Sequence, residues 1–174
     1  MTTTIKVGVS ACLLGQPVRY NGGHKHDRYI TETLGAFFSF VPVCPEVECG
    51  MTVPREPMRL EGDPYNPRLV TNLSRIDLTG QMLKYCRAKL PLLEQEELRG
   101  FIFKRDSPSC GLCQVKVYEY ESIMPTQNGS GLFAAAMQRR FPLLPMEDEG
   151  RLNDQAIRES FLERLFNCHR HQGF

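Results

Sequence analysis

The chain has 174 residues, a length that one domain with one hydrophobic core ordinarily accounts for. Hydrophobic residues make up 41% and charged residues 24% of the sequence, a globular composition that excludes intrinsic disorder as the main state. The formal net charge of +1 excludes the positive field with which many proteins hold nucleic acid non-specifically. We therefore expect any nucleic-acid contact to be local or to be supplied by another domain.

The sequence predicts a cytoplasmic protein that does not enter the membrane. It has no stretch of roughly 18 apolar residues, and its first six residues lack the basic start and apolar run of a signal peptide. A reducing compartment disfavours structural disulfides, and the odd number of cysteines, 7, cannot pair completely. The cysteines therefore point to metal, cluster or thiol chemistry.

The first third of the chain predicts two strands and one helix. The β-branched run at 5–9 predicts a strand that ends in a turn rich in glycine and proline. Asp27 is a candidate cap for a helix over the following ten residues, and 40–43 predicts a second buried strand. Residues 47–67 are rich in proline and charge, so we expect an irregular loop that covers a functional site.

The middle of the chain also predicts strands that alternate with a helix. Residues 68–71 predict a short strand, and Asp77 or Thr79 begins a helix that we expect to be interrupted or kinked near Pro91. The apolar run at 101–103 predicts a third core strand. It leads directly into a loop of serine, proline and glycine.

The last third predicts two more strands and two helices. Residues 115–118 alternate like an exposed or edge strand, and the glycines at 129–131 precede a helix. We expect another strand at 142–145 and a final helix capped by Asn153 or Asp154, with part of its apolar face packed on the sheet. This alternation predicts an α/β domain with a mainly parallel sheet, in which ligands bind beyond the carboxyl ends of the strands.

Three cysteines follow predicted core strands. Because parallel strands end at one edge of a sheet, Cys12, Cys44 and Cys110 should meet there. Three thiolates suit an iron-sulfur cluster or another soft metal, and they leave one coordination position open for a substrate. The pairs Cys44 with Cys49 and Cys110 with Cys113 also have spacings that suit a tetrahedral zinc. A zinc-stabilised binding module without catalysis is therefore the alternative.

The groups beside these cysteines suit acid/base catalysis near a Lewis acid. Glu46 follows Cys44 by two residues, and Ser107 and Ser109 precede Cys110. The neighbouring loops also carry basic residues that could hold a phosphate or the carbonyl group of a heterocycle. These residues are Arg19, His24, Lys25, His26, Arg55 and Arg59.

Four segments together resemble the bacterial thiouracil desulfidase family. They are Val9-Ser10-Ala11-Cys12-Leu13-Leu14-Gly15, Val18-Arg19-Tyr20-Asn21-Gly22-Gly23, Pro42-Val43-Cys44-Pro45-Glu46 and Ser107-Pro108-Ser109-Cys110-Gly111. The resemblance extends over nearly the whole chain and implies a Rossmann-like α/β fold. It also implies a 4Fe-4S cluster bound by three cysteines, which match Cys12, Cys44 and Cys110.

The resemblance further implies an activity and roles for individual residues. A desulfidase replaces the thiocarbonyl sulfur of a thiolated pyrimidine by oxygen from water and releases hydrosulfide. Glu46 and Ser107 match the catalytic positions of the family. We assign substrate binding to Ser10, Arg19, Tyr20, Ser109 and Arg55.

Two further segments, 53–60 and the ending from 141–145 through Arg164, resemble a branch that is usually fused to a second, C-terminal domain. Members of that branch are similar to desulfidases that act on 4-thiouridine in tRNA. We therefore treat residues 1–174 as one desulfidase-like catalytic domain that could be the N-terminal part of a two-domain protein. Any tRNA partner would then be held through the additional domain.

Overall fold

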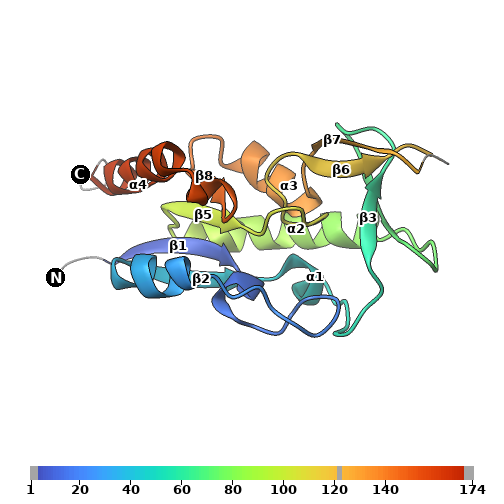
Figure 1. Ribbon diagram of the computed structural model, residues 1–174, viewed down its shortest axis with the longest axis horizontal. Coiled ribbons are helices and arrows are strands. Elements are labelled where there is room, and N and C mark those ends of the chain that lie inside the picture. Colours follow the sequence, from blue (N-terminus) through green and yellow to red (C-terminus); the bar gives the residue numbers. More distant parts are fainter. Residues whose placement is uncertain (1–3, 121–122, 171–174) are drawn as a thin grey trace.

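A computed structural model describes residues 4–120 and 123–170 (Figure 1). A parallel sheet of four strands, in the order β2-β1-β5-β8, forms its centre. The strands are β1 (Ile5–Ser10), β2 (Phe38–Val43), β5 (Gly100–Phe103) and β8 (Met146–Asp148). The predicted α/β fold with a mainly parallel sheet is confirmed.

A second sheet of four strands, in the order β4-β3-β6-β7, lies beside the first and was not predicted. Its strands are β3 (Met58–Glu61), β4 (Arg68–Thr71), β6 (Val115–Tyr118) and β7 (Pro125–Gly129). β3 lies inside the segment expected to be irregular, and pairing with β4 and β6 orders it. β6 has a neighbour on each side, so it is not an edge strand, but buried Val115 and Val117 alternate with exposed Lys116, as the alternative prediction of an exposed strand requires.

Four α-helices complete the fold: α1 (Pro45–Glu48), α2 (Thr79–Gln95), α3 (Leu132–Arg140) and α4 (Gln155–Arg170). α2 begins at Thr79, one of the two predicted starting residues, and Asp77 accepts the Thr79 N–H at 2.9 Å just ahead of the helix. Asp154 caps α4, as predicted, by accepting the Ile157 N–H at 3.1 Å. α2 continues through Pro91, and the predicted interruption there is wrong.

Two other sequence predictions need correction. The segment after Asp27 forms only a π-helical turn, Tyr29–Thr33, and a 3-10 turn, Leu34–Ala36, although Asp27 does accept the Ile30 N–H at 3.1 Å. Residues 142–145 form a turn, and the strand is the next segment, β8. Two prolines in that turn lack an N–H, so ladder pairing starts only where the Phe101 N–H donates to the Pro145 carbonyl.

Apolar side chains cover both faces of the central sheet. One core contains the stacked rings of Phe101 and Phe103, which pack on Phe133 of α3. The other core contains Phe161 and Leu165 of α4, which are fully buried, as predicted for this helix. The two cores explain why β5 is apolar along its whole length.

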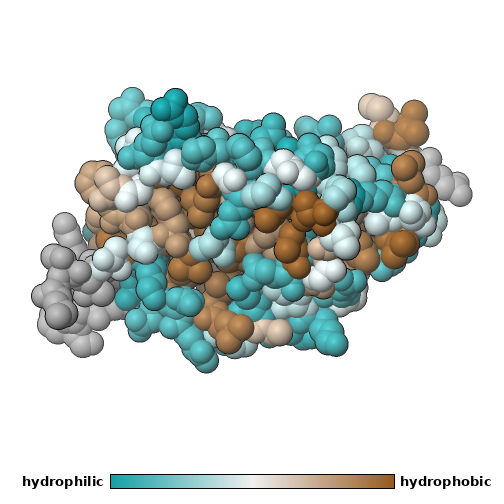
Figure 2. All heavy atoms as spheres, turned by 90° about the horizontal axis from the view of Figure 1, so that it is seen from below, coloured by the Kyte–Doolittle hydropathy of each residue, from teal (hydrophilic) through white to brown (hydrophobic). Residues whose placement is uncertain are grey.

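The molecular surface mixes both kinds of side chain. On the face in Figure 2, hydrophobic residues reach the surface in patches that hydrophilic residues separate. Within the described ranges, no helix is both long and apolar enough to cross a membrane.

One buried carboxylate organises the second sheet. Glu61, at the end of β3, is 1% exposed and accepts two hydrogen bonds from Arg75, at 2.6 and 2.7 Å, and one from Arg59 at 2.8 Å. Arg68 adds a longer ion pair at 3.8 Å. Hydrogen bonding from Arg75, followed by that from Arg59, lowers the pKa of Glu61 to about 2, against the effect of burial.

We predict that Glu61→Gln lowers the free energy of unfolding at pH 7 by about 2 kcal/mol, because it leaves buried arginine hydrogen bonds with a neutral partner. A carboxylate with a lowered pKa stabilises the fold above its ordinary pKa, and this stabilisation is lost as the pH falls toward 2. Urea titrations from pH 7 to pH 3 should therefore show the two proteins converging. Glu94→Gln, which breaks an exposed pair with Arg140, should change stability little at any pH.

Candidate active site

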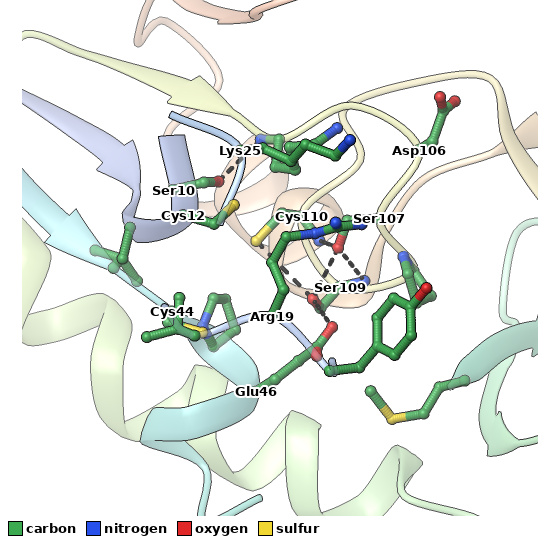
Figure 3. Close-up of a pocket in the computed structure, with 18 of the residues that line it drawn as sticks. Ser10, Cys12, Arg19, Lys25, Cys44, Glu46, Asp106, Ser107, Ser109 and Cys110 are labelled. Atoms are coloured by element: carbon green, nitrogen blue, oxygen red, sulfur yellow. Dashed lines mark hydrogen bonds between the residues drawn. The ribbon is translucent and has the colours of Figure 1, made fainter. Parts of the chain in front are cut away.

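A cavity of about 480 Å³ lies at the carboxyl ends of β1, β2 and β5 (Figure 3). The loops after these strands form most of its wall, together with Pro57 and with Met58 at the start of β3. The ten residues to which the resemblance gave catalytic, substrate-binding or cluster-binding roles all line this cavity. They are Ser10, Cys12, Arg19, Tyr20, Cys44, Glu46, Arg55, Ser107, Ser109 and Cys110.

Three separate elements supply the three thiols. Cys12 lies in the turn after β1, Cys44 is the residue before α1, and Cys110 lies in the loop between β5 and β6. Burial raises the pKa of Cys12 to about 11, although Lys104 acts in the opposite direction, and it raises the pKa of Cys44 and Cys110 as well. The three cysteines are close enough that a negative charge on one thiolate raises the pKa of another. Positive charge is therefore needed to hold all three as thiolates.

Hydrogen bonds fix the backbone at each thiol. The Cys44 N–H donates to the carboxylate of Glu48 at 2.7 Å, and the Cys110 N–H donates to Ser107 Oγ at 3.0 Å. The Cys12 carbonyl accepts the Lys25 N–H at 3.0 Å. The backbone that carries each thiol is therefore held in place by hydrogen bonds within the protein.

The Cys110 loop is seated on the start of α3. The first N–H groups of this helix donate to the carbonyls of Pro108 and Ser109. Gly131, just before the helix, permits the close approach, because a Cβ there would lie 2.4 Å from the carbonyl carbon of Ser109 and 2.8 Å from the Cys110 nitrogen.

We predict that Gly131→Ala displaces Cys110 and reduces metal loading several-fold, because the clash is with backbone that cannot move away without shifting the thiol. Gly80→Ala is the matched control. A Cβ at Gly80 meets nothing within 4 Å, and alanine at this helical position should stabilise the protein by up to about 1 kcal/mol. Metal content and thermal unfolding of the two variants check the prediction, which fails if both load equally.

Glu46 belongs to a chain of hydrogen bonds at the cavity floor. Ser109 Oγ donates to Glu46 Oε1 at 2.8 Å, and Ser107 Oγ lies 3.1 Å from Ser109 Oγ (Figure 3). Ser107 Oγ accepts two backbone N–H groups, from Ser109 and Cys110, so its own proton is directed toward Ser109. The chain therefore runs from Ser107 through Ser109 to the carboxylate.

Arg55 holds the other side of this carboxylate. Its Nε donates to Glu46 Oε2 at 2.7 Å, and its remaining nitrogens donate to the carbonyls of Val18 and Thr52. The side chains of Arg55 and Glu46 are 8% and 12% exposed. Three of the five N–H donors of Arg55 are thus engaged within the protein, one of them on Glu46, and its assignment to substrate binding stays a prediction.

The other side chains assigned to substrate binding differ in whether they already interact with groups of the protein. Ser10 is buried, and its Oγ accepts the Lys104 N–H at 2.9 Å, which ties the ends of β1 and β5 together. Arg19 lies over the ring of Tyr20, 5.5 Å from its centroid. Neither Arg19 nor Lys25 forms a salt bridge within the described part of the chain, so both cations are available to a ligand in the cavity.

Comparison with known proteins assigns the chain to a family. A family model described as 2-thiouracil desulfurase matches residues 7–149, which is most of the chain. The chain belongs to the 2-thiouracil desulfurase family. The matched range contains all three thiols and the Ser107–Glu46 hydrogen-bond chain, so the cavity at the strand ends is the candidate active site of a desulfurase.

Two individual relatives each match most of this chain. A solved structure of a [4Fe-4S]-dependent thiouracil desulfidase, TudS, is 32% identical, with a TM-score of 0.70, and the match covers 90% of this chain and 99% of that one. The uncharacterized protein YbbK of Bacillus subtilis is 29% identical over 151 residues, which is 84% of this chain and 97% of YbbK. The structural match agrees with the α/β fold.

The residues that line the site differ in part from the candidates that the sequence suggested. Lys104 lines the cavity, where it forms a salt bridge with Glu149 at 2.7 Å. Its position directly after a core strand was the signal that could have identified it. His24, His26 and Arg59 are not among the lining residues, and Arg59 belongs instead to the Glu61 cluster of the second sheet.

The four cysteines of the zinc alternative lie in different surroundings. Cys49 Sγ donates to the Glu46 carbonyl at 3.2 Å and lies near Gln81, whereas the charged groups around Cys113 are Asp148, Arg151 and Glu147. In the residues that the structure describes, no three His, Cys, Asp or Glu side chains are arranged to hold a single metal ion.

Proposed function

We propose that this desulfurase is a 4Fe-4S-dependent desulfidase that replaces the thiocarbonyl sulfur of a thiolated pyrimidine by oxygen from water and releases hydrosulfide. One observation carries the proposal: three thiols from three strand ends, two of them buried and that of Cys44 half-buried, border the same cavity as the Ser107–Ser109–Glu46 chain. Three thiols are a soft donor set, and such a set fits an iron-sulfur cluster.

Cys12, Cys44 and Cys110 would hold the cluster. A cluster with three protein ligands supplies one open iron, a Lewis acid that attracts the sulfur of a thiocarbonyl and makes the ring carbon more electrophilic. The relative TudS is named as a [4Fe-4S]-dependent thiouracil desulfidase, which supports this choice of cofactor.

Glu46 acts as the general acid/base in this proposal. Its carboxylate has about four lone-pair sites, and hydrogen bonds from Ser109 and Arg55 use only some of them. A remaining site can accept a proton from the attacking water at Oε1 and return it to a ring nitrogen or to the departing sulfur. The Arg55 guanidinium keeps the carboxylate in place during this exchange.

The remaining polar groups bind the substrate. Ser107 donates its proton toward Ser109, and Ser109, which donates to Glu46, keeps one lone pair that can accept an N–H of the pyrimidine ring. Arg19, Lys25 and Tyr20 surround the cavity with two cations and an aromatic ring, which suit an electron-rich heterocycle or an anionic group attached to it.

The substrates that we propose are thiouracil and 4-thiouridine, either free or within tRNA, in the cytoplasm. The net charge of +1 offers little general attraction for RNA. We therefore expect these 174 residues to act on small thiopyrimidines and nucleosides and to bind thiolated tRNA weakly. A second domain would supply stronger tRNA binding.

The decisive experiment is anaerobic purification followed by metal analysis and assay. We expect a brown protein with iron and acid-labile sulfide in equal amounts, which releases hydrosulfide from 2-thiouracil, 4-thiouracil or 4-thiouridine. Thiolated tRNA at two salt concentrations completes the substrate panel. A colourless protein that holds zinc and releases no hydrosulfide would contradict the proposal.

A further inference from the structure

Lys104 lies at the cavity, where three strand ends hold it in place. It directly follows β5, and its backbone N–H donates to Ser10 Oγ at the end of β1 at 2.9 Å. Glu149, the residue after β8, binds Lys104 Nζ at 2.7 Å with one carboxylate oxygen and accepts the Arg105 N–H at 2.8 Å with the other. Both the backbone and the ammonium group of Lys104 are therefore fixed before any ligand binds.

The ammonium group of Lys104 keeps one donor free. An ammonium group has three N–H donors. One of them binds Glu149 and another donates to the Arg105 carbonyl, also at 2.7 Å, and the structure gives the ammonium no further partner among the residues that it describes. The Lys104 side chain is only 18% exposed, so its third donor is partly shielded from water, where a charge-assisted hydrogen bond is stronger.

Lys104 also lies beside the thiols. β1 and β5 are parallel neighbours, with Val9 opposite Ile102, so the turn that carries Cys12 continues next to Lys104. Cys12, Cys110 and Lys104 all line the same cavity. Burial raises the pKa of Cys12 to about 11, and the charge of Lys104 is the largest influence in the opposite direction, which agrees with this placement. A substrate sulfur held at the thiols would thus lie near a fixed cation.

We propose that Lys104 is a catalytic residue that donates its free N–H to the sulfur atom leaving the ring, and that Glu149 is the positioning residue that orients it. The inference rests on the proposed desulfidase function. In that reaction the water oxygen bonds to the ring carbon, and the C–S bond breaks with its electron pair on sulfur. One proton of the water leaves with the sulfur as hydrosulfide, and the other passes through Glu46 to solvent. Lys104 transfers no proton and stabilises only the negative charge.

This hydrogen bond becomes stronger as the reaction proceeds. The thiocarbonyl sulfur of the bound substrate is neutral, whereas the leaving sulfur is an anion, and hydrogen bonds between charged groups are roughly twice as strong as neutral ones. Lys104 therefore stabilises the transition state more than the bound substrate. Removal of its charge should lower kcat much more than it raises KM.

Lys104→Met tests this role, because it removes the charge and keeps an unbranched side chain. We expect kcat for 2-thiouracil, normalised to iron content, to fall about 10- to 100-fold, the effect of one hydrogen bond to a charged group, while KM changes less than about 3-fold. The same loss is expected in Lys104→Met combined with Glu149→Gln, which leaves no unpaired carboxylate if the single variant folds poorly.

Two further variants complete the experiment. Glu149→Gln keeps the lysine but weakens its hold, so kcat should fall about 3- to 10-fold at unchanged KM. Lys6→Met is the matched control, since it breaks a salt bridge with Glu96 at 3.2 Å at the opposite end of β1. It should leave both kcat and KM unchanged.

The outcomes separate this inference from the proposed function. If the wild-type protein releases hydrosulfide and the variants without Lys104 retain their kcat per iron, the inference is wrong and the proposed function stands. If KM rises as much as kcat falls, the lysine binds the substrate and not the leaving sulfur, and the inference is also wrong. A wild-type protein that lacks the cluster or releases no hydrosulfide overturns both.

Discussion

Cys12→Ser, Cys44→Ser and Cys110→Ser should each abolish binding of the iron-sulfur cluster and, with it, the release of hydrosulfide. Each thiol comes from a different strand end and is held by its own backbone hydrogen bonds, so no neighbouring residue can take its place. A serine hydroxyl is a hard and weakly acidic ligand, unsuited to iron-sulfur chemistry. Iron and acid-labile sulfide, measured after anaerobic purification, are the readouts.

Cys49→Ser and Cys113→Ser are the matched controls and should keep the cluster. Both thiols are partly exposed and lie beside the proposed ligands in sequence, but Cys113 is surrounded by Asp148 and Arg151 rather than by the cavity. If either control lost iron as completely as Cys12→Ser, the set of three ligands with one open position would be wrong.

Glu46→Gln should keep the cluster and lower turnover by roughly 10²- to 10⁴-fold, the usual contribution of a general acid/base. Glutamine retains the shape of the side chain, but it has one acceptor oxygen where Ser109 and Arg55 use two, and it cannot accept a proton from water. Hydrosulfide release at saturating 2-thiouracil, normalised to iron content, measures the chemical step separately from loading.

Asp106→Asn provides the comparison for Glu46→Gln. Asp106 lines the same cavity, but its side chain is 76% exposed. Its backbone has a φ of 62°, a conformation that asparagine tolerates as well as aspartate, so the exchange should leave the loop intact. Normal turnover in Glu46→Gln together with a loss in Asp106→Asn would transfer the acid/base role to Asp106.

The sequence determined the central sheet because its strands satisfy a simple physical requirement. Strands buried on both faces are almost continuously apolar, so β1 and β5 stand out as runs of valine, isoleucine and phenylalanine. The edge strand β2 contains a similar run, although only Phe38 and Val43 at its ends are buried. Asp77 and Asp154 likewise marked the starts of α2 and α4, since a capping carboxylate acts within its own turn. Because Cys12, Cys44 and Cys110 each follow one of these parallel strands, the sequence also indicated that they would lie at one edge of the sheet.

Only the tertiary structure revealed the second sheet and the partners of individual polar groups. β3 has no apolar run of its own and is ordered by pairing with β4 and β6, which are distant in the sequence. Local sequence cannot show that Arg55 donates to Glu46, or that Glu61 accepts from Arg59 and Arg75, because each depends on which side chains meet across the fold. Short-range rules thus fix where the thiols lie, whereas long-range contacts decide which polar groups remain free for chemistry.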